Sequence, residues 1–175
     1  MASLTKLITH IKLEMSGDTK RYLVSVKQGD RKTRYIVAKL LNNGEEYTIP
    51  SGAKAIVNIK KPDGKRIYNS CTYSGSEVTV ELTSQALAAS GTAYCDIEIR
   101  TQDDSEIITS VTFEMEIEES MRSDKAIQSS NEFTALEEKI SEHIKNINDT
   151  EKAIKQAEED RVRAENNRAE EENIR

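Results

Sequence analysis

The sequence predicts an antiparallel, immunoglobulin-like β-sandwich followed by a long α-helix that forms a coiled coil. Up to about residue 120, short segments with alternating apolar and polar residues are joined by short turns. The stretch from Ser129 to Arg175 has no Gly or Pro and repeats apolar residues every seven positions. No helix-sized segments separate the strands, which favours antiparallel pairing. We therefore expect a β-sandwich over residues 1–120, a linker over 121–129 and a coiled-coil helix over 130–175.

Four strands are expected in the first 60 residues, three from a clear two-residue period and one, over residues 33–41, from its content of β-forming residues. They span residues 7–15, 21–27, 33–41 and 53–60. Asn42-Asn43-Gly44 predicts a turn after the third strand, because Asn and Gly adopt positive φ at low cost. Tyr47 and Ile49, in the loop that follows, are expected to fill the core.

Four further strands are expected over residues 66–73, 78–82, 92–100 and 107–118. The run from Lys61 to Lys65 contains Pro62 and Gly64 and predicts a hairpin, since Pro presets φ at one corner and Gly accepts the left-handed corner. Residues 83–90 are the one helix-like piece expected before the linker, with Gly91 ending it.

The long helix is expected to begin with a capping box formed by Ser129 and Glu132. Its seven-residue repeat predicts an oligomer seam, because one helix cannot bury its own apolar stripe. The seam residues are Phe133, Leu136, Ile140, His143, Ile147, Ile154, Ala157, Arg161, Ala164 and Arg168. The ionic end of the seam favours Arg–Glu pairs involving Glu158 and Glu165, within one helix and across to the next. A single solvated helix with the same internal pairs is the alternative.

Charge is unevenly divided along the chain. Residues 1–66 hold 14 bases and 6 acids, whereas residues 67–130 hold 3 bases and 12 acids. Either strands of the two halves interleave and neutralise one another, or a bipolar surface docks head to tail with a neighbour. The chain has no overall basic excess, which disfavours a nucleic-acid partner, and no apolar stretch of the length that spans a membrane.

No pattern in the sequence predicts catalysis, a metal site or a cofactor. It shows no nucleophile–base pairing, no Gly-rich phosphate loop and no zinc spacing, so an enzyme is not expected. Cys71 and Cys95 are expected to be small buried hydrophobes, with a disulfide as the alternative if their strands are adjacent. His10 is expected to be solvated. His143 is interpreted as a polar seam position, and a ring of imidazoles that binds an anion or metal or senses pH is the alternative.

Several segments, in order, resemble the N-terminal domain of phage baseplate upper proteins from phages of Gram-positive bacteria. They are Val26-Lys27-Gln28-Gly29-Asp30, Asn42-Asn43-Gly44-Glu45, Ile59-Lys60-Lys61-Pro62-Asp63-Gly64, Val78-Thr79-Val80-Glu81-Leu82-Thr83, Glu118-Glu119-Ser120 and Ser130-Asn131-Glu132-Phe133-Thr134-Ala135-Leu136. The resemblance implies a β-sandwich that anchors to the baseplate or tail tip. It also implies a helical shaft, usually trimeric, that leads to receptor-binding parts.

The predicted function is therefore a structural component of a phage, or phage-tail-like, baseplate or tail tip. The expected partners are two further copies of the chain, other baseplate or tail proteins, and a receptor-binding protein or further C-terminal fibre. We expect a virion protein that is assembled in the host cytoplasm, since residues 1–15 lack the apolar run of a secretory signal. The alternatives are a carbohydrate- or host-surface-binding sandwich with a helical spacer, and a head or collar fibre anchor.

Overall fold

The computed structural model describes residues 4–17, 22–121 and 132–173, apart from the side chains of Leu136 and of residues 169–173. The chain divides into two compact units, Met1–Ala135 and Leu136–Arg175, and each is described by itself. The expected capping residue Ser129 lies outside the described residues.

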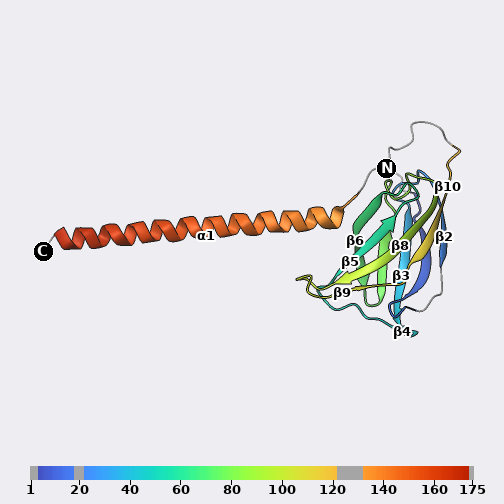
Figure 1. Ribbon diagram of the computed structural model, residues 1–175, viewed down its shortest axis with the longest axis horizontal. Coiled ribbons are helices and arrows are strands. Elements are labelled where there is room, and N and C mark those ends of the chain that lie inside the picture. Colours follow the sequence, from blue (N-terminus) through green and yellow to red (C-terminus); the bar gives the residue numbers. More distant parts are fainter. Residues whose placement is uncertain (1–3, 18–21, 122–131, 174–175) are drawn as a thin grey trace. The chain divides into compact units, whose positions relative to one another are not determined.

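The first unit is built from strands, most of them close to the predicted ranges (Figure 1). They are β1 (Leu7–Glu14), β2 (Leu23–Lys27), β3 (Arg34–Asn42), β4 (Glu45–Glu46), β5 (Lys54–Lys60), β6 (Arg66–Ser74), β7 (Glu77–Glu81), β8 (Gly91–Arg100), β9 (Ile107–Thr109) and β10 (Phe113–Glu118). Residues 83–90 form turns rather than the expected helical piece. The predicted turns are confirmed at Asn43, with φ 52°, and at Gly64, with φ 81°.

The strands form one sheet in the order β1-β3-β7-β6-β5-β8-β10-β2, with β4 paired to β3 and β9 to β8. Strands from the basic and acidic halves of the sequence therefore interleave. The expectation of wholly antiparallel pairing is wrong at both ends of the sheet, because β1 pairs β3 and β10 pairs β2 in parallel. Apolar–polar alternation identifies a half-buried strand but does not depend on the direction of its neighbour.

The sheet is nearly closed into a barrel. Strand β6 changes partner along its length, pairing β5 up to Cys71 and β7 from Thr72 onward. At the far side, the Val111 amide donates to the Glu14 carbonyl at 2.9 Å and joins the end of β1 to the start of β10. A mainly β domain is confirmed, whereas the immunoglobulin-like sandwich is not.

The inward-facing residues of the strands make one apolar core. Leu13, Leu40, Ile67, Ile97 and Met115 are among its fully buried side chains. Each such side chain contributes about 1.5–3 kcal/mol when it leaves water. The loop residues join this core as predicted, since Ile49 is buried and Tyr47 packs partly against it.

The expected strand 107–118 is interrupted between β9 and β10. Ser110 is buried there, and its hydroxyl accepts a hydrogen bond from the Ile97 amide at 3.0 Å. The hydroxyl thus takes the place of a backbone acceptor in the ladder, and the next amide, Val111, is free to bond Glu14. This short deviation lets the chain pass from the β8 ladder toward β1.

The second unit consists of the helix α1 (Thr134–Asn173), whose first two residues belong to the first unit. Its 40 residues measure about 60 Å at the usual rise of an α-helix. The predicted C-terminal helix is confirmed, and its assembly into a coiled coil stays a prediction.

Candidate functional site

The residues just before the helix are bound to the β domain at the edge of β6. The Tyr68 amide donates to the Glu132 carbonyl at 2.9 Å, and the Glu132 amide donates to the Arg66 carbonyl at 3.3 Å. These bonds form a parallel bridge between Glu132 and Ile67. We call Glu132, Phe133 and Thr134 the tether, because they fix the start of α1 on the sheet.

Side chains of the tether add further contacts to this backbone pairing. The Phe133 ring stacks on Tyr68 with 5.4 Å between ring centroids. The Thr83 hydroxyl donates to Glu132 Oε2 at 2.6 Å. The Thr134 hydroxyl donates to Asn69 Oδ1 at 3.0 Å, so the first helical residue is held by a side chain of β6. Phe133, which the heptad repeat places on the seam, thus has a partner within its own chain.

A buried lysine lies near the tether. Lys61 is only 2% exposed. Burial lowers the pKa of its ammonium group, and the carboxylates of Asp63 and Glu132 act in the opposite direction. Glu132 therefore contributes electrostatically as well as through its hydrogen bonds.

The helix itself carries an exposed apolar stripe. Three predicted seam residues, Ile140, Ile147 and Ile154, are 49%, 58% and 63% exposed. Ile144 is 52% exposed and was missed by the strict repeat, although it follows Ile140 by four residues and shares its face. The side chain of Leu136 lies outside the described residues. The remaining seam residues, His143, Ala157, Arg161, Ala164 and Arg168, are exposed on α1.

The ionic part of the helix forms pairs within one chain. Arg161 donates through Nε and Nη2 to the two carboxylate oxygens of Glu158, at 3.0 and 2.7 Å. Its Nη1 also lies 3.7 Å from a carboxylate oxygen of Glu165. This pairing raises the pKa of Arg161 and lowers that of Glu158. The pairs expected within one helix are therefore present, and pairs across helices stay a prediction.

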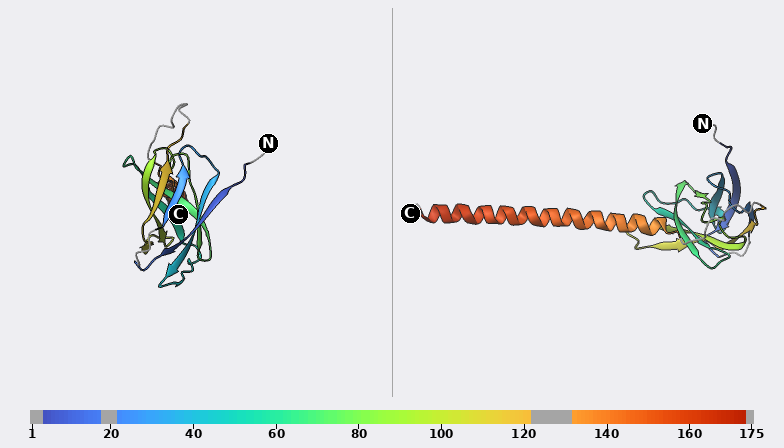
Figure 2. Two further views of the ribbon diagram at one scale, coloured as in Figure 1. Left: turned by 90° about the vertical axis from the view of Figure 1, so that its right-hand side faces the viewer. Right: turned by 90° about the horizontal axis from the view of Figure 1, so that it is seen from above.

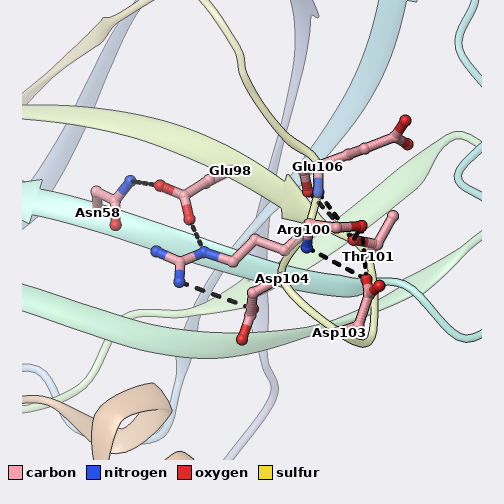
Figure 3. Close-up of polar contacts among 8 residues, drawn as sticks. Asn58, Glu98, Arg100, Thr101, Asp103, Asp104 and Glu106 are labelled. Atoms are coloured by element: carbon pink, nitrogen blue, oxygen red, sulfur yellow. Dashed lines mark hydrogen bonds and ion pairs between the residues drawn. The ribbon is translucent and has the colours of Figure 1, made fainter.

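A polar network covers the outer face of β5 and β8 (Figure 3). Asn58 Nδ2 donates to Asp96 Oδ1 at 2.7 Å and to Glu98 Oε2 at 3.4 Å. Glu98 also forms an ion pair with Arg100. Nη1 of Arg100 lies 3.9 Å from Oδ1 of Asp104. Burial raises the pKa of Asp96, and the Asn58 hydrogen bond opposes that shift.

The hairpin between β8 and β9 is ordered by its own hydrogen bonds. The Thr101 hydroxyl and the Ser105 hydroxyl and amide lower the pKa of Asp103 to about 2. Asp103 Oδ1 accepts from the Ser105 hydroxyl at 2.8 Å. Each of these polar groups is satisfied locally, so the arrangement rigidifies the turn.

An open groove of about 190 Å³ adjoins Asn58 on the same face. Tyr68, Tyr94 and Lys60 are among its lining residues. The rings of Tyr68 and Tyr94 give this groove aromatic surface of the kind that a carbohydrate could contact. Carbohydrate binding, the alternative function, stays a prediction.

The described residues show no cluster of His, Cys, Asp and Glu suited to a metal ion. Cys71 and Cys95 are both free. Burial raises the pKa of the Cys71 thiol to about 12 and raises that of Cys95 as well, so both thiols are unreactive in character. Within the described part of the chain, no helix has the length and apolar character to cross a membrane.

Comparison with known proteins gives one family and one fold. The family model for the BppU N-terminal domain matches residues 7–145. Among solved structures, the N-terminal domain of phage TP901-1 ORF48 is 15% identical, with a TM-score of 0.51. That alignment covers 64% of this chain and 99% of the other, and at this identity it shows the fold alone. No curated protein matches the chain.

Proposed function

This chain belongs to the BppU N-terminal domain family, and we propose on that premise that it anchors a trimeric stalk in a phage baseplate. The family consists of baseplate upper proteins, so a structural role in the virion tail follows from membership. The same membership suggests a non-enzymatic role. In the proposal, the β domain is the anchor and α1 begins the stalk.

The observation that carries the stalk is the exposed row of Ile140, Ile147 and Ile154. Isoleucines left half exposed on a helix lose the stabilisation of about 1.5–3 kcal/mol that burial of each would give. Their spacing of seven residues matches the contact line of helices that supercoil around one another. Parallel copies of α1 would cover this row, and Ile144 would pack at its margin.

The proposed number of chains rests on the resemblance to baseplate upper proteins, whose shafts are usually trimeric. The isoleucines alone do not decide it, because the intervening seam positions hold His143 and Ala157 instead of a uniform apolar residue. Receptor-binding parts would follow the stalk, and other baseplate proteins would hold the β domain.

The tether supports the anchoring role. A helix joined to the sheet by a flexible linker alone would transmit little force or orientation. Here Glu132, two residues before the helix, pairs with the backbone of β6, and the Thr134 hydroxyl donates to Asn69. Load on the stalk would therefore reach the β domain through hydrogen bonds and the Phe133–Tyr68 stack.

Analytical ultracentrifugation of seam variants tests the proposal. Ile140→Asp with Ile147→Asp places two charges on the seam and is expected to convert trimers into monomers whose β domain stays folded. The matched control is Ser141→Asp with Asn148→Asp, which adds the same charges at the same spacing one residue off the seam. We expect this control to remain trimeric. A trimer formed by the seam variant would refute the seam, and a monomeric wild type would refute the stalk.

A further inference from the structure

In the first half of β1, no other described strand pairs with the edge that faces away from β3. Strand β1 is the end strand, with β3 as its one neighbouring strand among the described residues. Leu7, Ile8, Thr9 and His10 are all exposed, and Leu7 and Ile8 are apolar side chains 50% and 52% exposed on opposite faces. In both views of Figure 2, the dark blue N-terminal strand leads out from the body of the β domain toward N. Exposed apolar edge strands are ready-made sites for pairing with another segment.

Backbone geometry identifies which groups this edge offers. The Leu7 amide bonds Thr33 and the Met15 amide bonds Leu41, so the odd-numbered residues of this segment face β3. The even-numbered residues face away, as the Glu14 carbonyl shows by accepting from Val111. Ile8, His10 and Lys12 share this parity. Their amide and carbonyl groups would therefore continue the ladder that Glu14 and Val111 begin.

The surroundings of this edge are basic. Lys6, His10 and Lys12 lie on or beside β1, and Arg31 and Lys32 precede β3. All five side chains are exposed. Two copies paired along this same edge would bring like charges together, which disfavours a second copy as the occupant. An acidic segment would instead be attracted.

We infer that the free edge of β1 binds an extended acidic segment of another protein by strand addition. The backbone of that segment would pair with Ile8, His10 and Lys12. Its acidic residues would lie on the face of the basic side chains of His10 and Lys12, and its alternate apolar residues would lie on the opposite face and cover Leu7. The pattern required is that of β10, where Glu114, Glu116 and Glu118 alternate with Phe113, Met115 and Ile117. The identification of the donor as another baseplate protein rests on the proposed function.

The test uses the isotope-labelled full chain and a synthetic peptide with the sequence of residues 112–119 as an acidic strand probe. Titration is followed by NMR, with hydrogen exchange measured at saturation. We expect shifts and slowed exchange at the amides of Ile8, His10 and Lys12, and weaker binding at high salt. A peptide with Lys in place of each Glu is the control and should not bind. Absence of binding at millimolar peptide, or shifts confined to other strands, would overturn the inference.

Two proline variants separate edge pairing from general disturbance. His10→Pro removes an amide that faces the free edge and leaves the β1–β3 bonds intact, so binding should weaken about tenfold. Ser25→Pro is the matched control on β2, the strand at the other end of the sheet. The Gln28 amide donates to Glu118 and the Glu114 amide donates to Tyr22, so the even-numbered residues of β2 face β10. The Ser25 amide therefore faces away from β10. Ser25→Pro should leave binding unchanged. Equal loss in both variants would contradict the inference.

A charge variant covers the case in which His10→Pro disturbs the fold. Lys12→Glu keeps the backbone and should weaken the peptide about fivefold. Unchanged affinity in Lys12→Glu would refute recognition by charge. Sedimentation of the same samples shows whether β1 pairs with a second copy of the chain. If the wild type self-associates and His10→Pro does not, the occupant of the edge is a second copy and not an acidic segment. A monomeric wild type that still binds the peptide would refute the stalk and retain the edge site.

Discussion

Asn58 is a neutral residue that donates hydrogen bonds to two acidic side chains on the outer face of β5 and β8. Its amide nitrogen donates to Asp96 and to Glu98, so two neighbouring carboxylates share one donor group. Its oxygen is buried without a partner among the described residues. Burial already raises the pKa of Asp96, and the charge of Glu98 adds to that shift. We therefore expect the β domain to be less stable if Asn58 is replaced by a residue that carries a negative charge and cannot donate these bonds.

We predict that Asn58→Asp lowers the free energy of unfolding by about 2 kcal/mol at pH 7, because it removes both donated bonds and adds a third carboxylate. The loss should shrink as pH falls toward 4. A carboxyl group whose folded-state pKa is raised loses stability as pH rises through that pKa, so acid relieves the variant more than the wild type. Urea unfolding at both pH values measures this. Thr72→Asp, at an exposed position of β6, is the control, and an equal loss at both pH values would contradict the prediction.

At the scale of elements, the tether joins the β domain through one parallel bridge, between Glu132 and Ile67 of β6, and through side-chain contacts. Glu132 pairs with the backbone of β6, and the next two residues bind Tyr68 and Asn69 by ring stacking and a hydrogen bond. Because these contacts join residues more than 60 positions apart, no local pattern in the sequence announces them. Phe133 fits the heptad repeat equally well, and the structure assigns its ring to Tyr68.

A double-mutant cycle of Phe133→Ala and Tyr68→Ala should give a coupling energy of about 1 kcal/mol in the free energy of unfolding of the β domain. The stacked rings, 5.4 Å apart, are the physical reason. Phe133→Ala combined with Tyr35→Ala is the control cycle. Tyr35 lies on β3, where its ring contacts the Lys6 ammonium group, and no coupling to Phe133 is expected. Coupling near zero in the Tyr68 cycle would show that the stack does not stabilise the tether.

Strand positions and the pairing of strands joined by a tight turn could be predicted from the sequence, whereas the other strand neighbours could not. Alternation located nearly every strand, since inward residues such as Val80 and Ile97 are buried while their neighbours are not. The parallel pairing of β1 with β3 has no turn to specify it, because β2 lies between them in the chain. The two-residue strand β4 is too short to show a period. Hairpins such as β5–β6, joined by a Pro and Gly turn, were predictable because the turn itself sets the pairing.

At the scale of the molecule, the two units draw their stability from different sources. The β domain has an apolar core of its own, and its strands bury their inward faces within one chain. The helix leaves Ile140, Ile147 and Ile154 exposed, and its ionic pairs lie at the surface, where they contribute little. In proteins, most of the stability of a helix comes from packing of its apolar face. The helix should therefore depend on association and the β domain should not.

Thermal unfolding of the full chain at two concentrations about a hundredfold apart tests this dependence. All six tyrosines lie between Tyr22 and Tyr94, so tyrosine fluorescence reports on the β domain and far-UV circular dichroism reports mainly on α1. The helical transition should move up by several degrees at the higher concentration, because association is coupled to helix formation, while the tyrosine transition stays fixed. In the Ile140→Asp, Ile147→Asp variant, the helical transition should lose its concentration dependence and the tyrosine transition should persist. A single transition seen by both probes in the wild type would contradict this prediction. It would mean that the β domain and the helix unfold together and that the tether couples their stabilities.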